Sequence, residues 1–460
     1  MSRASVQRPA AGPREAGAGA AAPVRVGILG LGTVGCGTVN VLLRNAQEIT
    51  RRAGRRIEIV QASARDIGKK RACPTSGIAL VPDAESVVRN PDIDVIVELI
   101  GGLDPARALV LEAIGQGKHV VTANKALIAL HGNEIFRAAQ ERGVMVAFEA
   151  AVAGGIPIIK AIREGLTANR IEWLAGIING TSNFILSEMR EKGADFADVL
   201  REAQRLGYAE ADPTFDVEGV DAAHKLTILA AIAFGIPLKF RDAYVEGISR
   251  VTRLDVSYAE ELGYRLKLLG IARRTESGVE LRVHPTLIPR RRLIANVEGA
   301  MNAVLVKGDA VGPTLFYGAG AGSEPTASAV VADLVDVVRT LTTDPTNRVP
   351  HLAFQPDALE DLSILAMEEV RTSYYLRMHA EDRPGVLADV TRILADLQIS
   401  IEAILQKEPA EGESVVPIII LTHRVVERSM NAAIARIESL GPIQGRVTRI
   451  RLEHLHADWH

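Results

Sequence analysis

Two lysines and a nearby aspartate stand out as groups that could move a proton. Lys225 follows Asp221 by four residues, so a helix would place both side chains on one face. Lys225 directly precedes the most apolar stretch of the chain, residues 226–238, and Lys125 follows the strand-like run 118–123. A partly buried lysine can supply a proton to the oxygen of a carbonyl that receives hydride. A surface ion pair is the alternative interpretation of Asp221 and Lys225.

Acidic residues are concentrated in the segment before Lys225. They are Glu210, Asp212, Asp216, Glu218 and Asp221. Such a cluster would bind an ammonium group, and the alternatives are a solvated loop or a metal site. No spacing of His, Cys and Asp matches a zinc pattern, so we interpret His224, His284 and His379 as structural.

A glycine-rich turn predicts a dinucleotide site. Gly30, Gly32 and Gly35 follow the apolar run 24–29 and precede a helical stretch, which is the context in which backbone N–H groups hold a pyrophosphate. A residue near the end of the second strand normally reads the adenine ribose: an acid there accepts from the 2′-OH of NAD, and an arginine pairs with the 2′-phosphate of NADP. Arg65 stands there, followed by Asp66. We therefore expect a preference for NADP, with NAD possible because of Asp66.

The surrounding elements form an α/β protein with three folded parts. Nearly continuous apolar runs at 24–29, 57–63, 93–100, 118–123 and 144–149 alternate with helical segments, which predicts a parallel sheet covered on both faces. This Rossmann-type domain is expected over 23–150, with segment 318–341 returning to it as a helix. Residues 151–317 predict an α+β catalytic domain, in which 155–165 and 216–235 are expected helices.

The C-terminal part predicts a separate module. Segment 342–372 contains Pro345, Pro350 and Pro356 and is expected to be a linker. Residues 373–453 follow the order βαββαβ, which is typical of a ferredoxin-like fold, and we expect this module to fold independently. The turn with Asp382, Gly385, Val386 and Leu387 opens a helix whose free N–H groups could hold an amino-acid carboxylate.

Composition excludes several classes of protein. The 460 residues carry a net charge of −3 and only 4% aromatic residues, so no nucleic-acid partner is expected. The longest apolar stretch is too short to cross a bilayer, so no membrane partner is expected either. Two cysteines are typical of a reducing compartment, and we expect a cytoplasmic protein. Residues 1–22 are rich in Ala, Gly and Pro and are expected to be a disordered tail.

Six ordered motifs resemble those of homoserine dehydrogenase. They are GLGTVG (30–35), VVTANKALI (120–128), FEAAVAGGIP (148–157), INGTSNFIL (178–186), GYAEADPTFDVEGVDAAHKL (207–226) and YGAGAGSEPTASAVVADL (317–334). The terminal module, with DRPGVLADV at 382–390, resembles an ACT domain. Over roughly residues 24–450 the chain is similar to the monofunctional bacterial form of this family, which has no aspartate kinase segment.

The resemblance implies interconversion of L-homoserine and L-aspartate 4-semialdehyde in threonine, methionine and isoleucine biosynthesis. It implies that Lys125 and Lys225 flank the substrate carbonyl and that Asp221 positions lysine and substrate. The implied substrate contacts are Glu210, Asp216, Gly180 and Thr181. The implied cofactor contacts are Gly30, Leu31, Gly32, Thr33, Val34, Gly35, Arg65, Lys125 and Gly322.

The resemblance also implies a cation, an effector and an oligomer. A monovalent cation, usually sodium, would be held by the backbone carbonyls of Glu149, Val152, Gly154 and Ile156, and a plain interdomain hinge is the alternative. Threonine is the implied effector at the turn that begins at Asp382; the alternative is a module that only dimerises. A homo-oligomer, dimer or tetramer, is expected. Two alternatives to the whole interpretation remain: another nicotinamide dehydrogenase of a small amino-acid aldehyde, or a non-catalytic amino-acid-sensing protein.

Overall fold

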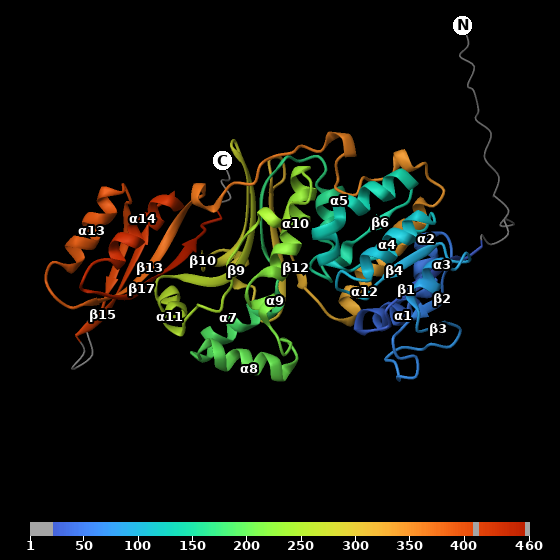
Figure 1. Cartoon of the computed structure of the whole chain (residues 1–460), viewed down its shortest axis with the longest axis horizontal. Coiled ribbons are helices and arrows are strands. Elements are labelled where there is room, and N and C mark those ends of the chain that lie inside the picture. The colour runs from blue at the N-terminus through green and yellow to red at the C-terminus, as the bar shows by residue number, and fades with distance from the viewer. Residues whose placement is uncertain (1–21, 408–413, 456–460) are drawn as a thin grey trace, which may run out of the picture.

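The computed structural model describes residues 22–407 and 414–455, and Figure 1 shows the chain arranged as three regions in a row. The N-terminal domain lies at one end, the C-terminal module lies at the other, and the large middle domain joins them. The tail expected over residues 1–22 lies outside the described residues except for Ala22. Within the described ranges no helix is both long and apolar enough to cross a membrane.

The N-terminal domain is built on a six-stranded sheet in the order β3-β2-β1-β4-β5-β6. All five neighbouring pairs are parallel. The strands are β1 (Val24–Leu29), β2 (Ile57–Ser63), β3 (Ala79–Val81), β4 (Val95–Glu98), β5 (His119–Thr122) and β6 (Val146–Ala147). Strands β4 and β5 are buried along their whole length, as expected of strands with helices on both faces.

Five helices of this part of the chain pack against the sheet, and a sixth returns from the middle domain. The five are α1 (Thr33–Arg44), α2 (Ala46–Ala53), α3 (Ala84–Arg89), α4 (Ala106–Gly115) and α5 (Lys125–Arg142). The sixth is α12 (Ser323–Thr340), whose buried valines and alanines join the core of β1 and α1. Gly37 of α1 makes this approach possible, because a Cβ there would lie 2.5 Å from the carbonyl oxygen of Ser323. The Rossmann-type sheet is present, as predicted. The returning segment becomes helical at Ser323 rather than at residue 318, because residues 318–319 belong to strand β12 (Gly312–Ala319).

The middle domain is a mixed sheet covered by helices. Its strands are β7 (Ile171–Ile177), β8 (Tyr244–Val245), β9 (Tyr264–Thr275), β10 (Gly278–Pro289), β11 (Met301–Gly308) and β12 (Gly312–Ala319). Its helices are α6 (Ile158–Lys160), α7 (Gly180–Lys192), α8 (Phe196–Leu206), α9 (Thr214–Val217), α10 (Val220–Phe234) and α11 (Arg253–Glu261). The helix expected over 155–165 is shorter, because α6 passes at Ala161 into a wider π-turn.

The C-terminal module has the predicted order βαββαβ. It contains β13 (Arg371–Glu381), α13 (Val386–Asp396), β14 (Ile401–Gln406), β15 (Val415–Thr422), the short β16 (Val425–Val426), α14 (Glu427–Glu438) and β17 (Ile443–Leu452). Both helices pack with the sheet through one cluster of buried aliphatic side chains. Their apolar residues recur at helical spacing, which explains why this fold was predictable from the sequence.

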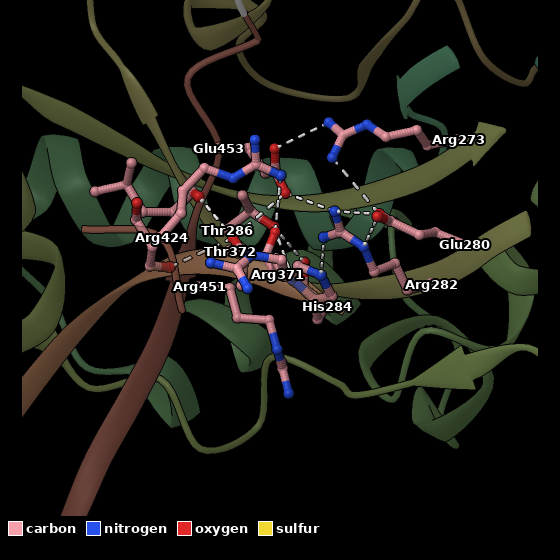
Figure 2. A network of polar contacts seen from close by, with 12 residues as sticks. Arg273, Glu280, Arg282, His284, Thr286, Arg371, Thr372, Arg424, Arg451 and Glu453 are labelled. Carbon is pink, nitrogen blue, oxygen red and sulfur yellow. Dashed lines mark hydrogen bonds and ion pairs between the residues drawn. The ribbon is translucent and has the colours of Figure 1, made fainter. Parts of the chain in front are cut away.

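The module is not separate from the middle domain, in contrast to our expectation. Strand β17 pairs in parallel with β10 at Thr286 and Leu287, so the two sheets form one sheet of order β12-β11-β7-β9-β10-β17-β13-β15-β14. Figure 2 shows the polar network that crosses this junction. Glu453 lies between Arg282, whose nitrogen is 2.5 Å from the carboxylate, and Arg273, at 3.3 Å. The module therefore completes the catalytic sheet and buries charges that need partners from both sides.

The segment expected as a linker, 342–372, contacts both neighbouring domains. Arg348 donates to the carbonyl of Gly143 at 2.7 Å and the N–H of Val146 donates to His351 at 3.1 Å, whereas the later residues lie beside the middle domain. It contains short 3₁₀ turns at Pro345–Asn347, Pro356–Ala358 and Met367–Glu369. The backbone N–H of Val279 donates to Ser363, and that of Leu365 donates to Val279. These hydrogen bonds fasten the segment beside the edge of β10.

Candidate active site

The centre of the candidate site is Asp221, which lies between two lysines. Its side chain is 3% exposed. One carboxylate oxygen is 3.2 Å from Nζ of Lys125 and the other is 2.7 Å from Nζ of Lys225. Lys225 also donates to the carbonyl of Ile178 at 2.8 Å, and its side chain is 12% exposed against 37% for Lys125. The predicted trio is thus brought together, and Asp221 and Lys225 are not a surface ion pair.

Local structure explains why these side chains meet. The expected helix 216–235 is broken at Gly219, which has a φ of 83°, so α10 begins at Val220 and Asp221 lies in its first turn. The helix dipole favours an acid at this position, and Lys225 follows one turn later. Lys125 is the first residue of α5, which Asn124 caps by accepting from the N–H of Leu127. Helix α5 follows β5, at the edge of the parallel sheet where ligands bind.

The two lysines decide the charge of Asp221. Burial alone would raise the pKa of this carboxyl, but Lys225 and Lys125 outweigh that effect and bring the pKa to about 2. The carboxylate therefore stays ionised throughout the physiological range. The two lysine side chains share this carboxylate, so both are held where an oxygen atom of a ligand could approach them.

Asn179 links Asp221 to the acidic turn. Its amide donates to Asp221 at 2.8 Å and to Asp216 at 2.7 Å, while its oxygen caps α7 by accepting from Ser182. Burial raises the pKa of Asp216; the Asn179 hydrogen bond opposes this and the Asp221 charge adds to it. The NGT turn therefore fixes two carboxylates at once.

The remaining residues predicted to contact the substrate are Thr181, Glu210 and Gly180, which belong to the same turns as Asn179 and Asp216. Thr181 donates to the carbonyl of Tyr208 at 2.6 Å. Glu210 is exposed, and its backbone carbonyl accepts from the Gln204 side chain at 3.0 Å. Gly180 packs against the carbonyl of Ala300, which a Cβ would approach to 2.8 Å. The acidic segment forms no group of three or more His, Cys, Asp or Glu side chains suited to a metal, within the ranges that the structure describes.

The glycine loop borders a cleft of about 910 Å³ at the same edge of the sheet. Gly30 has a φ of 99°, and a Cβ on Gly35 would lie 2.2 Å from the carbonyl of Gly30, so both positions require glycine. Gly32 has open space where a Cβ would stand. Thr33, Val34 and Gly35 form the first turn of α1, whose N-cap Gly32 offers no side-chain hydrogen bond. The loop fits a pyrophosphate, which needs close backbone approach and free N–H groups.

Arg65 and Asp66 both line this cleft, and Asp66 also accepts hydrogen bonds from its own loop. The Asp66 carboxylate accepts from the backbone N–H of Gly68 at 2.9 Å and of Lys69 at 3.2 Å. Arg65 makes no hydrogen bond or ion pair with another described residue. Gly322, with a φ of 133°, lies before α12, and Leu31 is 2% exposed beneath the loop.

The strip expected to hold a cation runs between the two domains. Ala153 and Gly154 have left-handed backbone, with φ of 53° and 36°. The Glu149 side chain accepts from the N–H groups of Ile159 and Lys160, so only its carbonyl could face an ion. Nearby, the buried amide of Asn302 has no hydrogen-bond partner among the described residues. The backbone carbonyl oxygens of this strip and the unpartnered amide oxygen of Asn302 are the kind of ligand that binds a small hard cation.

The predicted effector turn opens α13 with free backbone donors. Gly385 is its N-cap, with a φ of 96° and no side-chain cap. Val386 is buried, Leu387 is half-buried, and the exposed Asp382 accepts from Gln406 at 3.3 Å. The turn lies in the C-terminal module and is not part of the lysine site.

Several residues that support the site were not among those predicted from the sequence. Asn179 could have been recognised, because an Asn before Gly-Thr-Ser is a helix-capping signal. Glu98 had no such signal: its fully buried carboxylate accepts from Thr122 at 2.6 Å and from the N–H of Ile100 at 2.8 Å. The Phe215 ring centroid lies 5.6 Å from Nζ of Lys125. Only the tertiary structure brings that ring to the lysine.

The three histidines differ in their surroundings. His284 is fully buried and contacts Arg282 at 2.8 Å within the junction network of Figure 2. His224 packs between Phe215 and Phe240, and neither ring nitrogen has a partner in the described structure. Burial lowers the pKa of His224 to about 4, so it is neutral at physiological pH. His379 lies on β13 of the C-terminal module.

A parallel sheet with a glycine-rich loop, and with two lysines held by one carboxylate near its carboxyl edge, is typical of a nicotinamide-dependent oxidoreductase. Family models agree: residues 157–335 match "Homoserine dehydrogenase", residues 30–149 match its NAD binding domain, and residues 374–442 match the ACT domain. The chain belongs to the homoserine dehydrogenase family. It is an NAD(P)-dependent oxidoreductase with an ACT domain.

Individual relatives cover nearly the whole chain. A homoserine dehydrogenase of Pseudomonas aeruginosa is 68% identical over 94% of this chain and 100% of its own length. One from Neisseria gonorrhoeae is 57% identical over 94% of this chain and 99% of its own. The crystal structure of a homoserine dehydrogenase from Thiobacillus denitrificans is 72% identical, covers 95% of this chain and 99% of that chain, and has a TM-score of 0.91.

Proposed function

We propose that the chain interconverts L-homoserine and L-aspartate 4-semialdehyde with Lys125 and Lys225 as the proton-transfer groups. The observation that carries this proposal is the single buried carboxylate, Asp221, holding both lysines at the carboxyl edge of the cofactor sheet. When bound, the nicotinamide supplies hydride transfer. In the reducing direction a lysine ammonium gives a proton to the developing alkoxide, and the second ammonium stabilises its charge. Asp221 keeps both lysines in place without itself titrating.

The acidic rim fits the other end of an amino-acid substrate. Asp216 is fixed by Asn179, and the exposed Glu210 carboxylate has no partner among the described residues. Both could receive the substrate ammonium group, and the Thr181 hydroxyl could contact the substrate as its neighbour in the NGT turn. Gly180 would support substrate binding indirectly, because the absence of a side chain lets the NGT turn pack against Ala300.

The direct test is oxidation of L-homoserine by the full chain, followed through the absorbance of reduced nicotinamide. L-Serine, which is one methylene shorter, is the matched comparison, and it should react at least about tenfold more slowly because its hydroxyl falls short of the lysines. Absence of homoserine oxidation with either cofactor would contradict the proposal and favour an amino-acid-sensing role.

We also propose that NADP is preferred to NAD. Arg65 is free to pair with the 2′-phosphate, while Asp66 is occupied by backbone N–H groups. Arg65→Ala should raise the KM for NADP about tenfold or more and change that for NAD little, because one charge-assisted contact is lost. Lys70→Ala, an exposed neighbour outside the cleft, is the control. An equal effect of Arg65→Ala on both cofactors would show that Arg65 does not contact the phosphate.

A sodium ion at the carbonyls of Glu149, Val152, Gly154 and Ile156 is a further proposal. The carbonyls of Val152 and Gly154 accept no hydrogen bond from a described residue, which leaves them available to a hard cation. The ion would fasten this interdomain strip and take no part in proton transfer.

We propose that threonine is an effector that binds at the turn before α13. Its carboxylate would accept hydrogen bonds from the free backbone N–H groups at the start of this helix. Ala388→Asp places an acid in the exposed first turn of α13, where it repels a bound carboxylate but suits the helix dipole. We expect about tenfold weaker inhibition by threonine. Ala395→Asp, at the far end of the same helix, is the control. If threonine neither binds the intact chain nor changes its rate, the module has a structural role only.

We propose a homo-oligomer, dimer or tetramer, because the long sheet ends in unpaired edges. The edge strands are β12 and β14, and Ile404 on β14 is 40% exposed. Exposed strand edges are commonly covered by a second subunit. Light scattering should give at least twice the monomer mass, and Ile404→Lys should shift the population toward smaller species if β14 is the contact. A monomer for the unaltered chain would contradict the proposal.

A further inference from the structure

A cavity of about 470 Å³ lies where the catalytic sheet meets the C-terminal module. One wall is the loop 246–251, which follows β8, together with Pro285 of β10. The opposite wall is formed by α14 and the second half of β17. Its volume is within the range of small-molecule sites, and it is distinct from the lysine site and from the turn at 382–387.

The charged groups around the cavity do not balance. Arg250 and Arg446 line it from opposite walls, and neither has a hydrogen bond or ion pair with another described residue. Arg449 is different, because it pairs with Glu427 at 3.0 Å. The Glu438 carboxylate accepts from the backbone N–H of Val447 at 2.8 Å. Glu246 also lines the cavity, and its carboxylate lies 2.7 Å from Arg451. The three lining arginines outnumber the two lining carboxylates, and the two unpaired guanidinium groups leave the cavity with an excess of positive charge.

Apolar side chains form much of the remaining surface, beside the polar Asn431 and Thr448. Val251, Ile434, Val447 and Ile450 line the cavity, and all except Ile434 are buried. An inorganic anion would satisfy the arginines but leave these side chains unused. A ligand with one carboxylate and a compact aliphatic body would use both features, since guanidinium groups bind carboxylates bidentately and the aliphatic body gains from burial.

We propose that this cavity binds a small aliphatic carboxylate between the arginines of the two domains. The wall it would contact also supports the active site. The N–H of Ile248 donates to the carbonyl of Val217 at 2.8 Å, and a Cβ on Gly247 would lie 2.5 Å from that oxygen. Val217 is the residue after Asp216, so a ligand in the cavity would contact a wall that is hydrogen-bonded to the acidic turn of the substrate site.

The test is calorimetric titration of the full chain with sodium isovalerate, with no substrate or cofactor present. Binding is read without turnover, so the result does not depend on the proposed reaction. Arg250→Gln and Arg446→Gln should each weaken binding about tenfold, because each removes one charge-assisted contact. Both side chains are exposed, so the fold is expected to survive. Arg392→Gln, an exposed arginine of α13 outside the cavity, should bind as the unaltered chain does.

Three results would overturn the proposal. The first is no binding of isovalerate up to about 10 mM, which is the weak limit of a useful site. The second is unchanged affinity in both arginine variants. The third is inorganic phosphate binding as tightly as isovalerate, which would show that the aliphatic surface contributes nothing.

Discussion

Lys225→Ala is expected to lower kcat by about 100-fold or more, the usual scale for losing a positioned acid or base. Lys125→Ala should have an effect of the same order. The fold should survive in either variant, because Asp221 keeps one lysine partner and Asn179 in each case. Turnover of homoserine at saturating cofactor is the measurement. The dissociation constant of the cofactor should change little in Lys225→Ala, since Lys225 belongs to α10 and not to the cofactor domain.

Lys192→Ala is the matched control for these variants. Lys192 forms ion pairs with Glu188 and Glu202 on the exposed side of α7 and α8. Exposed ion pairs of this kind contribute little to the stability of the fold. Near-normal turnover in both active-site variants would remove the lysines from proton transfer and leave a water or a carboxylate as the carrier.

Glu453→Gln is expected to destabilise the chain by about 3–5 kcal/mol, the usual cost of removing one partner of a buried ion pair. Glu453 is buried and holds Arg282 and Arg273 across the junction shown in Figure 2. When the charge of Glu453 is removed, Glu280 is the carboxylate that still pairs with Arg282 in the described structure. Urea unfolding of the full chain measures the effect. Glu360→Gln, which breaks the exposed pair with Arg274, should cost less than about 1 kcal/mol.

The same carboxyl predicts how stability changes with pH. Burial raises the pKa of Glu453, but Arg282 and Arg273 outweigh it and bring the pKa to about 2, below the ordinary value of 4.5. A carboxyl whose pKa is lower in the folded state stabilises that state above its unfolded pKa, and the contribution is lost as pH falls from 4.5 toward 2. Glu453→Gln should therefore show a weaker loss of stability over this interval. An unchanged acid profile, together with unchanged urea stability, would show that the junction does not depend on this ion pair.

The sequence was most informative where a local signal coincided with a local element. The glycines at 30, 32 and 35 follow a strand, and the apolar spacing in 386–394 defines a helix face, so both domains could be predicted. The break at Gly219 was missed because a left-handed residue inside an apolar helical pattern looks like a tolerated glycine. It nevertheless decides that Asp221 starts a helix.

Long-range contacts were beyond sequence patterns. Nothing in the spacing of Glu453 and Arg282 indicates that they meet, because they lie 171 residues apart. The βαββαβ order of the module predicts independent folding, whereas strands β10 and β17 join the two sheets. The meeting of Lys125 with Asp221 was likewise suggested only by the family resemblance, since α5 and α10 belong to different domains.

The central claim is that Lys125 and Lys225 act as one unit through Asp221, and the variant that lacks both lysines tests it most directly. Groups that act as a unit are strongly non-additive. The kcat for homoserine oxidation in the double variant should therefore lie within about threefold of the slower single variant. Losses that multiply, so that two decreases of about 100-fold combine to about 10⁴-fold, would contradict the account and show two independent groups.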